Sequence, residues 1–186
     1  MRLFIAIEIP ENVRTRFASL LKEFRSIAPQ VKWVRAENLH VTLKFLGETE
    51  PAKLGALQNV LSAVRSAEPV SLEFRGLGFF PNEKRPRVFW AGMEASANLK
   101  SLAAEVDQAT HRLGFQMEER PFTPHLTLAR FPLPGVPPKL LQESQEKSAQ
   151  AFGSLRTGEF HLIESKLKPT GAEYTTVQTF RFATEA

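Results

Sequence analysis

The chain has 186 residues, of which 42% are hydrophobic and 24% charged, an ordinary composition for a globular protein with a sizeable core. It contains no cysteine, which excludes disulfides, thiolate nucleophiles and cysteine-bound metals. The net charge of +4 is compatible with an anionic partner but is weak evidence for one. We expect a single two-lobed domain over residues 1–186 in the cytoplasm. Its first apolar run ends at Glu8, too early for a secretion signal or a membrane span.

Turn-forming residues divide the chain into segments of two kinds. Some have apolar residues at a period near 3.6, which predicts helices, and others have apolar runs or alternation, which predict strands. In chain order we expect a strand at 2–9, a helix from Pro10, strands at 31–34 and 39–46, a helix from Thr49, strands at 70–80 and 87–93, a helix at 96–113, a strand at 125–131, a helix at 139–151, and strands at 155–167 and 174–182.

Most neighbouring strands in this order are joined by short turns. The second and third strands, for example, are separated by Glu37 and Asn38 and should form a hairpin. Short connections favour antiparallel sheets, so the predicted fold class is α+β. Ser96 is expected to cap the third helix and Gly114 to end it. Because helix–strand units recur in both halves, an internal duplication is the simplest account of the order.

One four-residue motif, His-x-Thr-Leu, occurs twice, as His-Val-Thr-Leu at 40–43 and as His-Leu-Thr-Leu at 125–128. On an extended strand the His and Thr of each copy point to one face and the two apolar residues to the other. Each copy follows turn-forming residues and precedes a basic residue and a phenylalanine. One face therefore suits a core and the other a functional site, and the repeat indicates that both copies serve the same site.

Two histidines and two threonines suit chemistry at a phosphate. Imidazole has a pKa near 6.5, so one of His40 and His125 can act as a base while the other, protonated, acts as an acid. The hydroxyls of Thr42 and Thr127 can each donate a hydrogen bond to a negatively charged non-bridging oxygen. Phosphodiester cleavage needs these functions and no metal, and we expect no cofactor.

Other interpretations of these residues stay open. A single His on a strand is more often structural than catalytic, and Thr is a common strand former. A metal site would need more ligands, because two His without close acidic neighbours fall short of the usual three or four. His111 and His161 lack a Thr partner, and we interpret them as structural or solvent-facing. The basic loop 84–87 is either a solvated hairpin loop or a phosphate-contacting loop.

The most specific stretch of the sequence is 120–130, Arg-Pro-Phe-Thr-Pro-His-Leu-Thr-Leu-Ala-Arg. Further informative stretches span nearly the whole chain and are Arg2 to Ala6, Trp33-Val34, Leu39 to Glu48, Gly78 to Pro81, Pro86 to Gly92, and Glu164-Ser165 with Leu167, Gly171 and Tyr174. With the two motifs, they resemble the two-histidine phosphoesterase superfamily and, within it, the RNA 2′,3′-cyclic phosphodiesterase family, historically described as 2′-5′ RNA ligase. No motif position departs from the pattern.

This resemblance implies a bilobal, duplicated α+β fold, with two antiparallel sheets flanked by helices and a central cleft that carries both motifs. It implies metal-independent opening of a 2′,3′-cyclic phosphate, on an RNA end or a small cyclic nucleotide, to a 2′-phosphomonoester, with reversible 2′-5′ RNA ligation as a further activity. It assigns the acid to His40, the base to His125 and the non-bridging oxygens to Thr42 and Thr127. We expect a monomer with no membrane partner. The alternative is a non-catalytic module that grips an RNA end or a nucleotide phosphate.

Arg130 closes the most specific stretch and is a candidate substrate contact. Strict alternation from His125 places it on the opposite face, so it reaches the site only if the strand ends or bulges near Ala129. Aromatic side chains could stack a terminal base, although core packing is their usual role. The candidates are Phe45, Trp33 and Phe79.

Overall fold

The computed structural model describes residues 1–184, which form nine strands, four α-helices and two short 3-10 helices. In chain order these elements are β1 (Arg2–Glu8), α1 (Glu11–Ile27), β2 (Lys32–Trp33), η1 (Ala36–Asn38), β3 (His40–Glu48), η2 (Pro51–Lys53), α2 (Leu54–Ser62), β4 (Val70–Phe80), β5 (Val88–Ala95), α3 (Asn98–His111), β6 (Leu126–Arg130), α4 (Pro138–Glu146), β7 (Ala151–Thr157), β8 (Glu159–Lys168) and β9 (Gly171–Arg181).

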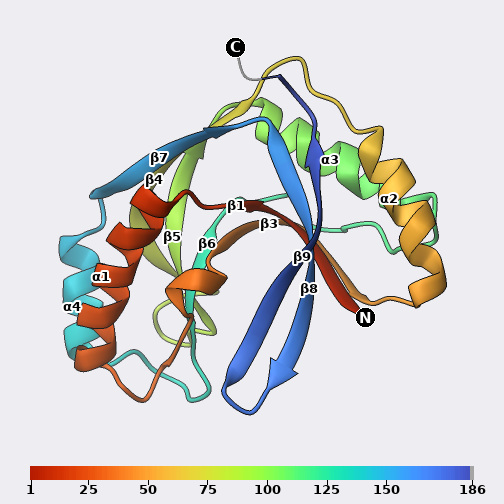
Figure 1. Ribbon diagram of the computed structural model, residues 1–186. Helices are drawn as coiled ribbons and strands as arrows, with labels where there is room; N and C mark the ends of the chain where they lie inside the picture. The colour runs from red at the N-terminus through yellow and green to blue at the C-terminus, as the bar shows by residue number, and fades with distance from the viewer. Residues whose placement is uncertain (185–186) are drawn as a thin grey trace.

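The strands form two sheets. The first sheet has the order β3-β1-β8-β9 and the second sheet the order β2-β6-β5-β4-β7. Neighbouring strands are antiparallel throughout both sheets. In Figure 1 the sheets stand side by side in the middle of the molecule, with the helices on the outside. The predicted α+β class, two antiparallel sheets flanked by helices, is confirmed.

Pairs of helices bury one face of each sheet. Helices α1 and α4 pack against the second sheet, while α2 and α3 pack together beside β9 and β3 (Figure 1). The apolar stripe of α1 is buried, and its Phe17 and Phe24 rings lie 5.6 and 5.7 Å from those of Phe74 and Phe89 in the second sheet. Burial of each such side chain contributes roughly 1.5–3 kcal/mol, so the helix stripes fix which face of each sheet stays open.

The hairpin predicted for residues 31–46 is not formed. Strand β2 has only two residues and pairs with the end of β6 in the second sheet, whereas β3 pairs with β1 in the first. Trp33 accounts for the difference, because its indole packs against Phe24 and Phe89 in the core of the second sheet. Burying this large ring holds β2 away from β3, and η1 carries the chain from one sheet to the other.

The single strand predicted at 155–167 is in fact two strands. Strands β7 and β8 part at Gly158, where the chain crosses from the second sheet to the first. A Cβ atom on Gly158 would lie 2.2 Å from the carbonyl oxygen of Ala183, so this close approach requires glycine.

Several helix boundaries also differ from the prediction. Helix α2 begins at Leu54 rather than at Thr49, because the 3-10 turn η2 comes first. The side chain of Ser96 does not cap α3, because its Oγ accepts a 2.9 Å hydrogen bond from the backbone N–H of Ser71. Helix α4 ends at Glu146 rather than at Ala151, whose backbone pairs with β4. Helix α3 ends at His111, two residues before the predicted last residue 113, and the turn that follows reaches Gly114, whose φ of 88° is left-handed.

Both motif strands carry a bulge at the same place, the fourth residue of the motif. In β3 the extra residue is Leu43, because Thr42 and Lys44 pair with Ala6 and Ile5, which are adjacent in β1. In β6 the extra residue is Leu128, because Thr127 and Ala129 pair with consecutive residues of β5. A bulge shifts the alternation by one, so the second residue beyond it returns to the His-Thr face.

Candidate active site

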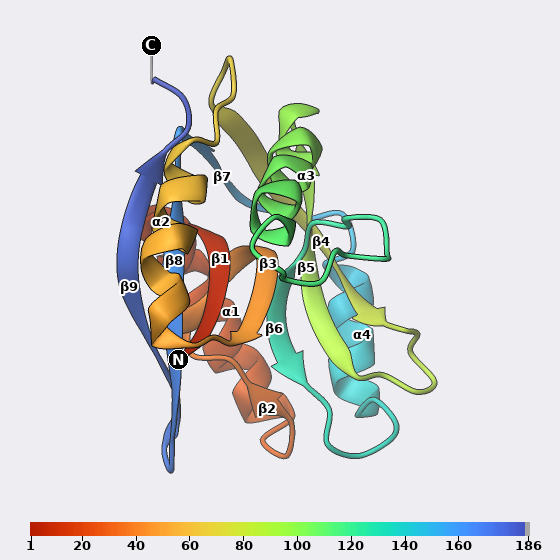
Figure 2. The same ribbon diagram turned by 90° about the vertical axis from the view of Figure 1, so that its right-hand side faces the viewer.

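The two motifs lie on neighbouring sheet edges. Strand β3 is the edge of the first sheet, and the first part of β6 is an edge of the second because β2 pairs only with its last two residues. Residues of β3 and β6 come within 8 Å of each other between Cα atoms, and Figure 2 shows the two strands side by side. The fold thus brings together two segments from opposite halves of the chain.

Each motif histidine is held by the same hydrogen bond. Nδ1 of His40 lies 3.0 Å from the carbonyl oxygen of Asn38, and Nδ1 of His125 lies 2.9 Å from that of Thr123. A carbonyl oxygen only accepts, so each Nδ1 must carry the proton and donate. Nε2 is then the nitrogen left to exchange protons with a substrate.

His40 is set among aromatic rings of the first sheet. Its ring centroid lies 6.0 Å from that of Phe4 and 5.6 Å from that of Tyr174. Burial lowers the pKa of His40 below 6.5, and the backbone hydrogen bond to Asn38 and the carboxylate of Glu8 oppose this effect. In the free protein this histidine therefore tends to be neutral near pH 7.

His125 has a different setting. It is exposed and directly precedes β6, while Thr127 is half-buried and pairs with Trp90 of β5. Thr42 is also half-buried and pairs with Ala6 on the face that carries His40. In each copy His and Thr are thus two residues apart at the start of an edge strand, as the alternation predicts.

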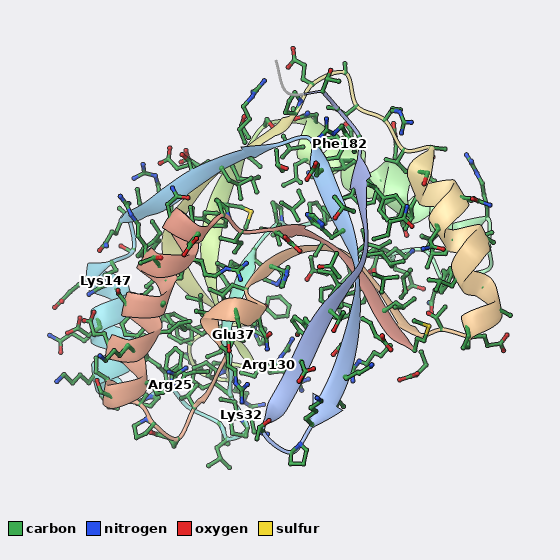
Figure 3. All side chains as sticks on the ribbon, viewed as in Figure 1. Arg25, Lys32, Glu37, Arg130, Lys147 and Phe182 are labelled. Atoms are coloured by element: carbon green, nitrogen blue, oxygen red, sulfur yellow. The ribbon has the colours of Figure 1, made fainter. Side chains whose placement is uncertain are left out.

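Arg130 lies on the His-Thr face. The bulge at Leu128 moves it there, because it pairs with Val88, two residues from Trp90 on β5. Its neighbour on the other side is Lys32 of β2, and Figure 3 shows these two exposed cations close together. Within residues 1–184, neither has a carboxylate oxygen within 4 Å.

In the first motif copy, Lys44 and Phe45 occupy the positions that Ala129 and Arg130 occupy in the second. Lys44 is only 2% exposed, forms an ion pair with Asp107 of α3, and donates a 2.7 Å hydrogen bond to the carbonyl oxygen of Gln116. Phe45 is 53% exposed and its ring centroid lies 5.6 Å from that of Phe4. The first copy therefore places an aromatic ring where the second places Arg130.

The remaining histidines and the basic loop lie outside the paired motifs. His111 is exposed at the end of α3. His161 is 8% exposed, and its Nδ1 lies 3.0 Å from Thr179 Oγ1. In the loop that joins β4 to β5, Lys84, Arg85 and Arg87 are exposed. Within residues 1–184 no cluster of three or more His, Asp or Glu side chains is placed to hold a metal ion.

Sequence reasoning missed three contributors to the site. The carbonyl groups of Asn38 and Thr123 orient the histidines, and a backbone role of this kind leaves no signal in side-chain identity. Trp90 lies opposite Thr127, which the β5–β6 register alone reveals. Of the aromatic candidates, Phe79 and Trp33 belong to the core or pack against it, and Phe45 is exposed.

None of the helices within 1–184 combines the length and apolar character of a membrane span.

Comparisons with known proteins place this geometry in context. The family model described as LigT like Phosphoesterase matches residues 7–90 and 92–174. An RNA 2′,3′-cyclic phosphodiesterase of Methanothermobacter thermautotrophicus is 36% identical over 182 residues, covering 97% of this chain and 98% of the relative. One of Thermotoga maritima is 30% identical over 184 residues, covering 98% and 96%.

Two solved structures have a similar fold along nearly the whole chain. The protein TT0787 of Thermus thermophilus superposes with a TM-score of 0.80 at 32% identity, covering 98% of both chains. LigT of E. coli complexed with 3′-AMP superposes with a TM-score of 0.74 at 28% identity, covering 97% of both chains.

Proposed function

The chain belongs to the LigT-like phosphoesterase family, and we propose that it is a metal-independent RNA 2′,3′-cyclic phosphodiesterase. The observation that carries the proposal is the matched pair of histidines on neighbouring strand edges, each with Nδ1 donating to a backbone carbonyl, which leaves Nε2 to exchange protons with a substrate. The activity named for the relatives over nearly their full length supports the same reaction class. The substrate is an RNA end or a small nucleotide that carries a 2′,3′-cyclic phosphate.

The reaction needs one base and one acid on opposite sides of phosphorus. Water attacks phosphorus in line with the 3′ oxygen, and Nε2 of His125 removes the water proton. As the new P–O bond forms, the bond to the 3′ oxygen breaks, and protonated Nε2 of His40 gives its proton to that oxygen. The products are a 2′-phosphomonoester and a 3′-hydroxyl. His125 has gained one proton and His40 has lost one.

Hydrogen-bond donors from both motif copies stabilise the negative charge on the phosphate. The Oγ–H groups of Thr42 and Thr127 donate to the non-bridging oxygens, on which negative charge accumulates in the transition state. Arg130 adds a positive charge on the same face as Thr127. The anion also raises the pKa of His40 on binding, which offsets the effect of burial and supplies the protonated acid that the reaction requires.

A defined substrate tests the proposal. In excess EDTA the purified protein should convert adenosine 2′,3′-cyclic phosphate to the 2′-phosphate, identified by chromatography against both phosphate isomers. His40→Ala and His125→Ala should each lower kcat by about 10²–10⁴-fold, the range for general acid–base catalysis. His111→Ala, at an exposed histidine outside the motifs, is the matched control. A 3′-phosphate product, or unchanged turnover in either motif variant, contradicts the mechanism, and tight binding without product favours the non-catalytic module.

One chain supplies both histidines, which supports a monomer as the active unit. The absence of cysteine suits the reducing cytoplasm, where we place the protein. Ligation to a 2′-5′ bond is the same step with a 5′-hydroxyl in place of water: its oxygen forms the new bond to phosphorus, the bond to the 3′ oxygen breaks, and the same four side chains serve it.

A further inference from the structure

Glu8 lies beside the first motif histidine, on the face of the first sheet that carries His40 and Thr42. It is the last residue of β1 and pairs directly with His40 of β3. Directly paired residues on antiparallel strands point to the same face, with Cβ atoms about 4.5–5.5 Å apart. The proposed reaction takes a proton from His40 and uses Glu8 in no step, so the carboxylate beside the proton donor has no role yet.

A residue from another strand of the same sheet holds the carboxylate of Glu8. The hydroxyl Oγ1 of Thr176 donates a 2.9 Å hydrogen bond to Glu8 Oε1. Thr176 belongs to β9, which is the opposite edge of the sheet from β3. The side chain of Glu8 is 41% exposed, so without this hydrogen bond it could turn into solvent. The contact therefore fixes the position of one negative charge on the face of His40.

A second histidine lies next to the same carboxylate. His161 of β8 pairs with Ala6, which also pairs with Thr42, so His161 lies on the face of the motif although it belongs to neither copy. Its side chain is buried, and its Nδ1 lies 3.8 Å from Glu8 Oε1. Glu8 therefore has a histidine on each side, His40 on β3 and His161 on β8.

The charged groups around His40 come from several elements and act in opposite directions. Burial lowers the pKa of His40, the backbone hydrogen bond raises it, Glu8 of β1 also raises it, and Arg14 of α1 and His161 of β8 lower it. The phenol ring of Tyr174 of β9 also faces this histidine, at 5.6 Å between ring centroids. Among these side chains of residues 1–184, Glu8 is thus the one anion, and it favours the protonated ring.

We propose that Glu8 is a positioning residue for the acid of the reaction: its carboxylate, fixed by Thr176 beside His40, keeps the imidazolium of His40 protonated until the 3′ oxygen takes the proton. The inference rests on the proposed function and deepens it, because it explains how a half-buried histidine supplies a proton. Burial disfavours a charged imidazolium, and a nearby anion offsets that effect. Burial also lowers the pKa of His161, so His161 is neutral near pH 8 and the charge of Glu8 then acts on His40 alone.

The pH dependence of kcat/KM separates this role from a structural one. With adenosine 2′,3′-cyclic phosphate, Glu8→Gln should lower kcat/KM by about 3–10-fold at pH 8, where the acid is hardest to keep protonated. The loss should shrink as the pH falls towards 5, because His40 is then protonated without help. Glu8→Asp, which keeps the charge, should recover most of the native kcat/KM at pH 8.

Two further variants serve as controls for this profile. Glu48→Gln removes a carboxylate from the other end of β3 and should leave kcat/KM unchanged at every pH. His161→Gln should show no loss that grows with pH, because a neutral His161 adds no charge at pH 8. No loss in Glu8→Gln, or a loss of the same size at every pH, overturns the inference and leaves the phosphodiesterase intact.

Nuclear magnetic resonance measures the proton affinity of His40 without turnover. The chain has four histidines, so the ring signals that disappear in His40→Asn identify this residue. The pKa of His40 should be lower in Glu8→Gln than in the native chain and unchanged in Glu48→Gln. An unchanged pKa in Glu8→Gln overturns the inference even if the enzyme is active. If the pKa falls but the native chain opens no cyclic phosphate, the proposed function fails, whereas the charge of Glu8 still favours protonated His40.

Discussion

The two copies of the motif share a backbone and differ in what surrounds it. In each, a histidine donates from Nδ1 to a carbonyl two residues before it, a threonine follows two residues later, and a bulge falls on the fourth residue. Around His40 the first sheet places Phe4, Tyr174 and the exposed Phe45. The second sheet leaves His125 exposed and places Arg130 at the position equivalent to Phe45.

The proposed function gives each motif copy one half of the reaction, and these surroundings are what distinguish the two copies. The shared bulge places His and Thr alike in both copies and returns the second residue beyond it to their face. The residues that the bulge turns toward the core are also different, a buried Lys44 in one copy and Ala129 in the other. The setting of the first copy therefore lowers the pKa of its histidine, and the second copy adds the exposed cation Arg130 to its His-Thr face.

The largest effect should come from a substrate that needs only one of the two histidines. A nitrophenyl phosphodiester has a leaving group that departs without a proton, so only the base is still required. We expect His125→Ala to lose about 10²–10⁴-fold in kcat on both this ester and the cyclic nucleotide. His40→Ala should lose as much on the cyclic nucleotide but less than about 10-fold on the ester. Steady-state kinetics of the two variants on both substrates measure the contrast.

The opposite pattern, with His125→Ala rescued by the ester, would exchange the two roles and leave the two-histidine mechanism standing. Equal losses on both substrates in both variants would instead mean that the copies are not divided into acid and base. His111→Ala again serves as the control for general effects of removing an imidazole.

The core-facing positions should differ strongly in stability. Lys44→Met removes one partner of a buried ion pair and leaves Asp107, whose side chain is 14% exposed, without its cation. Loss of one partner of a buried pair costs about 3–5 kcal/mol, and we expect the lower end because Asp107 keeps the backbone N–H of Glu118 at 3.2 Å. Urea denaturation measures the change in the free energy of unfolding.

Restoring the balance of charge provides the control for this prediction. The double variant Lys44→Met with Asp107→Leu should regain part of the loss, because no charge is then buried alone. Lys44 also holds the segment before the second motif through Gln116, so activity should fall together with stability in the single variant. A single variant as stable as the native chain would show that this ion pair contributes little.

Much of this site could be predicted from the sequence. The rest could not, because it depends on pairing between strands that are distant in the sequence. Alternation alone places His40 with Thr42 and His125 with Thr127, because it depends on local geometry. The face of Arg130 depends on a bulge that only the partner strand defines. The pairing of β2 with β6 and the opposition of Trp90 to Thr127 are likewise properties of the register between strands, which hydropathy patterns do not encode.

The smallest effect concerns pH and tests the effect of partial burial on the first histidine. Burial lowers the pKa of both His40 and His161 below 6.5 in the folded protein. The unfolded chain therefore binds more protons as the pH falls through about 6.5, and the free energy of unfolding should decrease in the same interval. The decrease should not exceed about 1.4 kcal/mol per pH unit for each histidine, and it should end below the folded pKa values. Urea midpoints measured between pH 8 and 5 should fall less steeply in His40→Asn than in the native chain, and identical slopes would contradict a lowered pKa of His40.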